Sequence, residues 1–457
     1  MAVLSPDQIV ELVKKPFNQE DIKRAKEQSK RLKFHTEATT VKKQIVKLSR
    51  DFLEWVASFL EDEAKRVRFA TFLQNPPIAT VETTEKIWKK LGRIWHTQDS
   101  FRGINFRDQE EDLECEEYLN KINLQRFIRT DCYQEYQVSP NSFVVVDMPQ
   151  EQEGELQDPK AHIVSLWVLI DYRNSDEKTE YIIFEVGKKE DLPNGGIAAF
   201  DDETFRLFPK DNNGQISSLR VLEEPHILGR CPAYQIGKKK VDPLNDQFVI
   251  NEVVPSLSGF DFFLYKKISK KYLDSYMMPV MDILDKECTY EGCQNGKVSR
   301  TSQKTGDVIW DPCPICAEND VIGAGSVHIK PPATKEDPDV GDSVSFITPD
   351  VDYLEWADGN IGKMEEVLIA NCAGVLDVEG NQQAKNEDQI AQSFENRIDV
   401  LIPLSETFEW LEENVSEAIC VFRTGNPDGE VTINNGTDFF LRSVDDLMNE
   451  FKIAKEA

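Results

Sequence analysis

The sequence predicts an α+β fold in which helical regions flank a β-rich module. Apolar residues recur at steps of three and four before about residue 75 and again after about residue 255, which is typical of helices that bury one face. Between about residues 143 and 234, runs of β-branched and aromatic residues alternate with turn residues, which is typical of strands. With 457 residues, 40% of them hydrophobic, the chain can bury a substantial core.

Residues 1–100 are predicted to be a helical region. Its clearest amphipathic stretch carries a face made of Val41, Ile45, Leu48, Phe52, Val56 and Phe59. Asn75-Pro-Pro should break this helix, and a second helical run is expected at 84–91. The first fifty residues hold 12 basic and 6 acidic side chains, and we expect them to form a solvated helix face.

Residues 101–245 are predicted to form the β-rich module. The strand candidates are 162–171, 181–186 and 205–208. Asn194-Gly-Gly196 and Asp211-Asn-Asn-Gly214 have the composition of turns and should separate the strands.

Two apolar helices are predicted to bracket an insertion. The first lies within 246–279, begins after Pro255 and should end before Pro279, which cannot continue a helix. The second lies within 348–376 and opens with Thr348-Pro349, a cap followed by a first-turn proline. The insertion between them is 280–347.

The last part of the chain is predicted to contain a flexible loop, a long helix and a short end. The loop is 377–387, and the helix at 388–424 should bend at Pro403. Residues 425–457 carry a hairpin signal at Asn435-Gly436 followed by a short helix.

The strongest chemical pattern is a pair of short-spaced cysteine pairs inside the insertion, Cys288 with Cys293 and Cys313 with Cys316. Four thiolates on two turns suit the tetrahedral geometry of Zn²⁺ and leave no open coordination position, so the predicted metal is structural. Two disulfides and a rubredoxin-like iron site are the alternatives. The other five cysteines stand singly and are expected to be buried small hydrophobic residues.

Catalytic patterns are weak throughout the chain. It has neither a phosphate-binding Gly-x-x-x-x-Gly-Lys-Ser/Thr motif nor His-Glu-x-x-His. Asp171, Glu185 and Lys188 are only loosely similar to a metal-dependent nuclease, because the lysine is shifted to the wrong strand face. The net charge of −29 opposes ordinary nucleic-acid binding. No run of apolar residues is long enough to span a bilayer. We therefore expect a protein that is not an enzyme and that assembles in the cytoplasm.

The order of these parts resembles the tailed-phage portal protein family. Three segments resemble sequences of Bacteroidetes-phage portals. They are 72–78 (Phe-Leu-Gln-Asn-Pro-Pro-Ile), 226–232 (His-Ile-Leu-Gly-Arg-Cys-Pro) and 346–349 (Phe-Ile-Thr-Pro). The resemblance implies a wing built from 1–100, 101–245 and 388–424. It also implies two stem helices, a zinc-ribbon-like clip at 280–347 and a tunnel loop at 377–387. The short end at 425–457 implies a reduced or absent crown.

By the same resemblance, the chain is expected to form a homo-oligomeric ring, a dodecamer, at the capsid vertex of a virion. Its implied partners are the terminase large subunit, a head-tail adaptor, the major capsid protein and double-stranded DNA passing through the channel. Gln382, Gln383 and Lys385 are carried over by position as candidate contacts to that DNA, against the alternative of an ordinary loop. A zinc-ribbon protein that binds nucleic acid or a transcription complex is the second hypothesis, and a nuclease the third.

Overall fold

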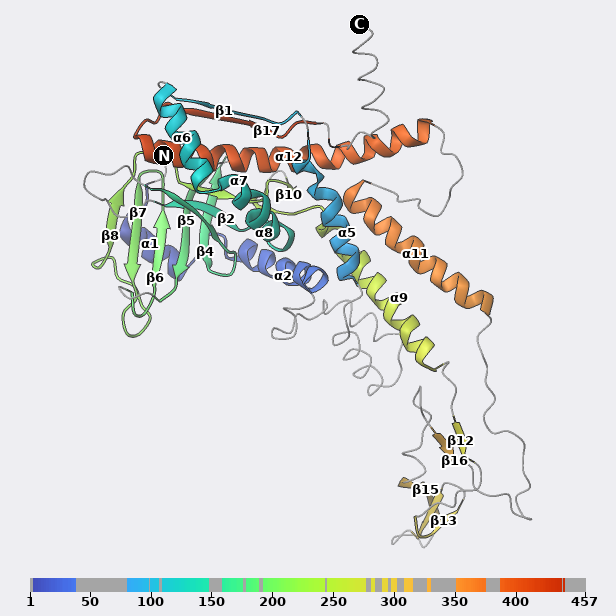
Figure 1. The fold of residues 1–457 in the computed structure, drawn as a ribbon. Helices are drawn as coiled ribbons and strands as arrows, with labels where there is room; N and C mark the ends of the chain where they lie inside the picture. Colours follow the sequence, from blue (N-terminus) through green and yellow to red (C-terminus); the bar gives the residue numbers. More distant parts are fainter. Residues whose placement is uncertain are drawn as a thin grey trace, which may run out of the picture. The chain divides into compact units, whose positions relative to one another are not determined.

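A computed structural model of the chain shows a mixed α and β protein, which agrees with the predicted class (Figure 1). None of the helices that the structure describes is long and apolar enough to cross a membrane. The described residues are 3–37, 80–97, 99–106, 109–147, 158–175, 178–188, 192–242, 245–276, 281–283, 290–294, 297–301, 308–314, 327–329, 351–374, 387–437 and 439.

Two compact units make up the chain. The larger one joins Met1–Asp261 to Glu365–Ala457, and the smaller one is Phe262–Met364. The smaller unit lies within the part that the sequence singled out as an insertion together with the helices that bracket it. We describe each unit by itself.

The larger unit begins with helices. Ser5 caps α1 (Pro6–Lys14), because its hydroxyl accepts a hydrogen bond from the backbone N–H of Gln8, while the Gln8 side chain accepts from the Ser5 N–H. The next helical elements are α2 (Gln19–Thr36), α5 (Val81–Leu91) and the 3-10 turn η1 (Gly92–Trp95). The amphipathic helix expected at 41–59 lies outside the described residues.

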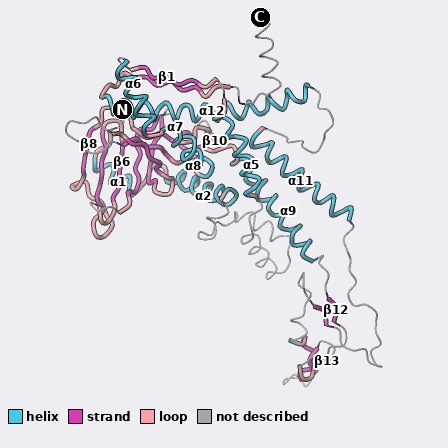
Figure 2. The backbone as a smooth tube through the Cα atoms, in the orientation of Figure 1, coloured by secondary structure: helices cyan, strands magenta, loops and turns pink. Residues whose placement is uncertain are grey.

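The β-rich module contains two antiparallel sheets (Figure 2). One follows chain order through β4 (Leu169–Ser175), β5 (Lys178–Val186), β6 (Gly196–Phe200), β7 (Thr204–Pro209) and β8 (Leu222–Pro225). The other has the order β3 (Lys160–Val164), β2 (Phe143–Asp147), β9 (Ala233–Gln235). A further strand pair, β10 (Lys240–Asp242) with β11 (Asn245–Val249), follows.

Two expectations for this module need correction. The single strand predicted at 162–171 is two strands, because a turn closed by the Val168 N–H to Ser165 carbonyl hydrogen bond separates β3 from β4. The stretch from 109 to 138 is helical, although it was assigned to the β-rich module. It contains α6 (Gln109–Lys121), α7 (Leu124–Arg126), the π-helical turn η2 (Phe127–Cys132) and α8 (Tyr133–Val138).

The two sheets and the N-terminal helices share hydrophobic cores. One core packs α2 against both sheets through Ile22, Phe143, Tyr172 and Phe184. A second core lies between α1 and the five-stranded sheet, with Ile9 buried against Ile183 and Phe208. The alternating pattern along β4 to β7 thus has an apolar partner on each face of the sheet.

The long helix α12 (Glu387–Thr424) continues through Pro403 as one helix. Apolar side chains at steps of three and four bury one face along it, among them Leu404, Phe408, Leu411 and Val415. Figure 1 shows α12 beside β1 (Phe101–Asn105) and β17 (Glu430–Asn434), which pair antiparallel. The strand expected to form a local hairpin at Asn435-Gly436 therefore pairs with a segment more than 300 positions earlier, a partner that local turn signals cannot specify.

The remaining elements belong to the insertion and its brackets. They are η3 (Val254–Ser256), α9 (Leu257–Tyr276), β12 (Met281–Ile283), β13 (Cys293–Gln294), β14 (Lys297–Thr301), β15 (Val308–Pro312), β16 (Val327–Ile329) and α11 (Val351–Ala373).

Candidate metal centre

A three-stranded antiparallel sheet in the order β13-β14-β15 positions two of the four cysteines of the predicted knuckle. Val298 in the central strand pairs with Cys293 on one side and with Asp311 on the other. Cys313 follows Asp311 by two residues. Both thiols are therefore carried toward the same end of the sheet, the end at which Gln294 pairs with Lys297.

The burial of these two cysteines differs. Cys313 has 0% of its surface exposed, whereas Cys293 is half-buried. Cys288 and Cys316 lie outside the described residues. In the part of the chain that the structure describes, no group of three or more His, Cys, Asp or Glu residues could hold a metal ion. The site of four thiolates thus stays a prediction. The positions of Cys293 and Cys313 in the paired strands are compatible with it.

The two ends of the insertion are tied together by a parallel strand pair. β12 follows α9 and β16 precedes α11, and their pairing aligns Met281 with Val327 and Ile283 with Ile329. The three-stranded sheet lies between these strands in the sequence. The chain therefore leaves and returns through one short β-ladder.

The bracketing helices meet in antiparallel order. In the larger unit, Cys372 hydrogen-bonds to Ser256, and burial raises the pKa of the Cys372 thiol to about 11. A Cβ added at Gly259 would lie 2.8 Å from Leu368 Cδ2, so a larger residue there would require the end of the Leu368 side chain to shift. In the smaller unit, Lys270 Nζ lies 2.5 Å from Asp358 Oδ1. Residues later in α9 therefore contact residues earlier in α11, as in any antiparallel helix pair.

A buried polar network, which the sequence did not indicate, holds the first turn of α9. Asp261 is 2% exposed and contacts His35 Nε2 at 2.9 Å and Arg31 Nη2 at 2.7 Å. The other ring nitrogen of His35 lies 3.0 Å from the hydroxyl of Thr80. The network joins α2, the start of α5 and α9, and it contains Asp, His and Thr in a row. Asp261, His35 and Thr80 are buried and contact one another, which favours a structural role.

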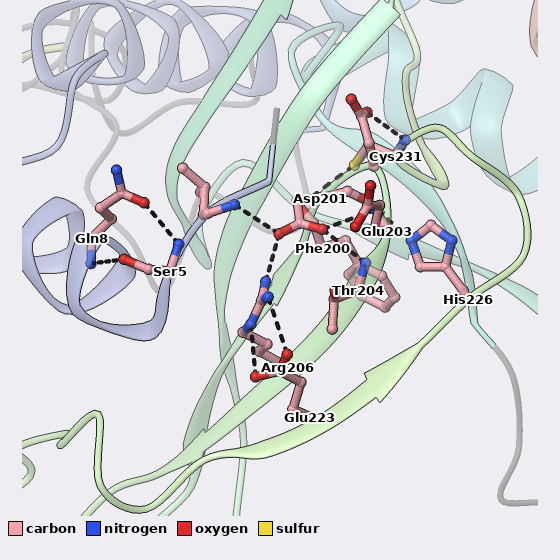
Figure 3. Close-up of polar contacts among 12 residues, drawn as sticks. Ser5, Gln8, Phe200, Asp201, Glu203, Thr204, Arg206, Glu223, His226 and Cys231 are labelled. Carbon is pink, nitrogen blue, oxygen red and sulfur yellow. Dashed lines mark hydrogen bonds and ion pairs between the residues drawn. The ribbon is translucent and has the colours of Figure 1, made fainter. Parts of the chain in front are cut away.

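A second network anchors the N-terminus on the five-stranded sheet (Figure 3). Asp201, in the turn from β6 to β7, accepts from the backbone N–H groups of Leu4 and Thr204 and pairs with Arg206 Nη1 at 2.5 Å. Both side chains of the Asp201–Arg206 pair are at least 95% buried. His226 Nε2 lies 3.0 Å from the Asp201 carbonyl, and burial lowers the pKa of His226. The arrangement fixes chain geometry and leaves the Asp201 carboxylate no open position.

The residues considered for a nuclease are not brought together for that chemistry. Asp171 is fully buried and accepts hydrogen bonds from the backbone N–H groups of Phe17 and Asn18 and from the Tyr181 hydroxyl. Glu185 is exposed and pairs with Lys210 at 3.0 Å. The Asp171 carboxylate is thus used to hold the connection between α1 and α2.

A cavity of about 370 Å³ lies between α6, α12 and the β1-β17 pair. It is lined on one side by Arg102, which pairs with the buried Glu412 at 2.9 Å. Burial lowers the pKa of nearby Arg129, and the like charge of Arg102 lowers it further. The cavity wall is mixed, with Asp112, Glu116 and Leu113 opposite these groups, and shows no constellation typical of a catalytic site.

The other predicted site residues divide clearly. The candidate DNA contacts Gln382, Gln383 and Lys385 lie outside the described residues. The single cysteines are confirmed as buried, with exposed fractions of 2% or less, and they are Cys115, Cys132, Cys231, Cys372 and Cys420. The thiols of Cys115 and Cys420 hydrogen-bond to each other between α6 and α12.

No family model and no curated protein matches this chain. Two of the solved structures similar to it are necks of GTA particles. The neck of a native GTA particle, computed with C12 symmetry, has a TM-score of 0.32 and 11% identity and covers 82% of this chain and 85% of that chain. The neck of an empty GTA particle, computed with C6 symmetry, has a TM-score of 0.34 and 12% identity and covers 83% and 84%. At such TM-scores the likeness carries no argument about the fold or the function of this chain.

Proposed function

We propose that this chain is the ring-forming portal subunit of a tailed phage, through which DNA enters and leaves the capsid. One observation carries the proposal. Two helices, α9 and α11, enclose a small β unit, and a long helix, α12, follows them. This is the order of stem, clip, stem and wing helix expected from the portal-like sequence motifs.

The proposed location is the portal vertex of the virion, after assembly in the host cytoplasm. The partners are other copies of the chain in a dodecamer, the terminase large subunit, a head-tail adaptor and the major capsid protein. The acidic balance suits this role, because a ring of net negative charge would let a duplex slide without holding its phosphates. Gln382, Gln383 and Lys385 are proposed to contact DNA as it passes.

In this proposal the insertion is a clip braced by a structural Zn²⁺ on Cys288, Cys293, Cys313 and Cys316. The ion would supply the cross-link that so small a sheet lacks, since a closed four-thiolate site contributes directly to folding. The pairing of the three strands sets the positions of two of these cysteines. β14 aligns β13 and β15 so that Cys293 and Cys313 come to one end of the sheet.

Native mass measurement of the purified full-length chain tests the proposal. A portal subunit is expected to give a species close to twelve times the 52.3 kDa chain mass. A chain that stays monomeric or dimeric at the highest attainable concentration contradicts the proposal.

The small sheet also gives an observation in favour of the zinc-ribbon alternative. Trp310 of β15 is 49% exposed, on the face of the sheet that it shares with Ser299. An exposed aromatic ring can stack on nucleic-acid bases. Salt-sensitive binding of single-stranded DNA that is lost in Trp310→Ala, in a protein that forms no ring, would favour this alternative.

A further inference from the structure

The part of α11 that belongs to the smaller unit is a helix with little cover. None of its described side chains between 352 and 364 is buried. Ala357, Ile361 and Met364 are half-buried and follow one another at steps of four and three, so they form the covered face. Trp356 is 61% exposed.

The opposite face of this helix segment contains two interior glycines. Asp352, Glu355, Gly359 and Gly362 follow one another at steps of three and four, so they share a side. A Cβ added at Gly359 or Gly362 would meet nothing within 4 Å. Each glycine costs the helix about 1 kcal/mol relative to alanine. Packing within the subunit does not require either one, but glycines allow another helix to approach closely.

The matching surface lies on α9. Its outward side carries Phe262 and Tyr265, both half-buried, whose rings stack at 6.2 Å. Lys266 is exposed and its Nζ lies 5.3 Å from the centre of the Phe262 ring. The buried residues Phe263, Leu264 and Ile268 point to the other side. The outward side thus combines flat aromatic rings with a cation.

The charges of the two surfaces are complementary. The Phe262 and Tyr265 side of α9 carries the exposed cation of Lys266, whereas the glycine face of α11 carries the exposed carboxylates of Asp352 and Glu355. Lys270 and Asp358 pair with each other within the subunit and do not belong to either surface. Opposite charges across an interface favour one pairing and disfavour like with like. A surface of each sign on one chain suits a head-to-tail contact, which closes into a ring when it is repeated.

We infer that α9 of one copy packs its Phe262, Tyr265 and Lys266 surface against the Gly359 and Gly362 face of α11 in the next copy. Trp356 then borders the contact and loses its exposure to water. This inference rests on the proposed ring, and it names the surfaces through which neighbouring copies bind.

Steric variants test the contact. In Gly362→Leu and Gly359→Leu, the added side chain has room within the subunit, so the thermal unfolding temperature should stay the same or rise. Ring formation should need at least about tenfold more protein, because a leucine blocks close helix approach. The control is Asn360→Leu, an exposed residue turned about 100° from Gly359, which should assemble like the wild type.

Charge variants test the direction of the contact, and mass photometry at about 0.01 M ionic strength keeps the screening length near 30 Å. Lys266→Glu alone and Glu355→Lys alone should each raise the concentration needed for rings by about threefold or more. An equimolar mixture of the two variants should restore assembly toward the wild-type level, because copies can alternate so that opposite charges face each other at every junction.

The outcomes separate this inference from the proposed ring. Rings that tolerate Gly359→Leu and Gly362→Leu, or singly reversed charges that the mixture does not rescue, overturn the inference and leave the ring standing. A wild-type chain that forms no ring overturns both. Loss of assembly in Asn360→Leu as well as in the glycine variants also contradicts the inference, because the effect would then not be specific to the Gly359 and Gly362 face of α11.

Discussion

The β-rich module and the small inserted sheet use different means to hold strands together. In the module, β4 to β8 bury apolar side chains on both faces, against α1 on one and against α2 and the second sheet on the other. In the inserted sheet, Cys313 is fully buried, but Val308 and Trp310 of β15 are 58% and 49% exposed. The difference shows that strand pairing alone does not make a core. We propose that a metal stabilises the small sheet.

The largest expected effect concerns Cys313. Cys313→Ser should remove bound zinc and make 280–347 sensitive to protease, because structural zinc sites contribute about 10–16 kcal/mol of apparent binding free energy. The thermal unfolding of the β-rich module should change little, since its core is independent of the metal. Zinc analysis and mapped proteolysis measure both parts.

Cys231→Ser is the matched control, because Cys231 is buried in the core of the β-rich module. This variant should keep its full zinc content. Unchanged zinc content in Cys313→Ser would refute the four-cysteine zinc site. Neither the inserted sheet nor the β-rich module would then depend on zinc bound by Cys313.

Breaking the buried ion pair of the β-rich module comes next. Asp201→Asn leaves the buried Arg206 guanidinium with only the half-exposed Glu223 as a charged partner and weakens the anchor of Leu4, so we expect a loss of about 1.5–3 kcal/mol in the free energy of unfolding. Chemical denaturation measures this loss. The zinc content should be unchanged, and a loss below about 1 kcal/mol would contradict the role assigned to the pair.

A smaller and pH-dependent effect is expected at Glu252. Its carboxyl is 8% exposed, accepts from the Tyr136 hydroxyl at 3.0 Å, and has a pKa raised by burial from its ordinary value of 4.5. A raised folded-state pKa means that the folded state holds this proton more tightly. Its stabilising contribution is full below pH 4.5 and is lost as pH rises through the raised pKa.

Glu252→Gln removes this titration. The unfolding free energy of the wild type minus that of the variant should therefore decrease between pH 4 and pH 7, as measured by urea denaturation at each pH. A difference that increases over this range would contradict the burial of the charged group.

The smallest effect is expected at Glu185, on the rim of the five-stranded sheet. The side chain is 55% exposed and its pair with Lys210 faces water, so Glu185→Ala should change stability by less than about 1 kcal/mol. The same variant tests the nuclease hypothesis, for which a DNA-cleavage activity that disappears with Glu185 would be required.

The sequence predicted what local patterns can encode. The helix predicted after Pro255 is present, and Phe260, Leu264 and Ile268 form its buried face. Such a helix can be predicted because 3.6-residue periodicity requires only neighbours along the chain. The turns at Gly195 and Gly214 have the positive φ angles that their glycines suggested.

Long-range pairing was beyond the reach of those patterns. The partner of Val431 is Ile104, and Asp261 is buried because His35 and Arg31 come to it from α2. Neither contact leaves a signal in the residues nearby. The predicted metal site is an intermediate case, because cysteine spacing indicates it and the strand register brings Cys293 and Cys313 to the same end of the small sheet.

Single-particle electron microscopy of the purified full-length chain tests the central claim most directly. A portal subunit should appear as closed rings with an open central channel, and rotational averaging should reveal twelvefold symmetry. Particles of monomer or dimer size without a channel, at every concentration and with zinc supplied, would contradict the account.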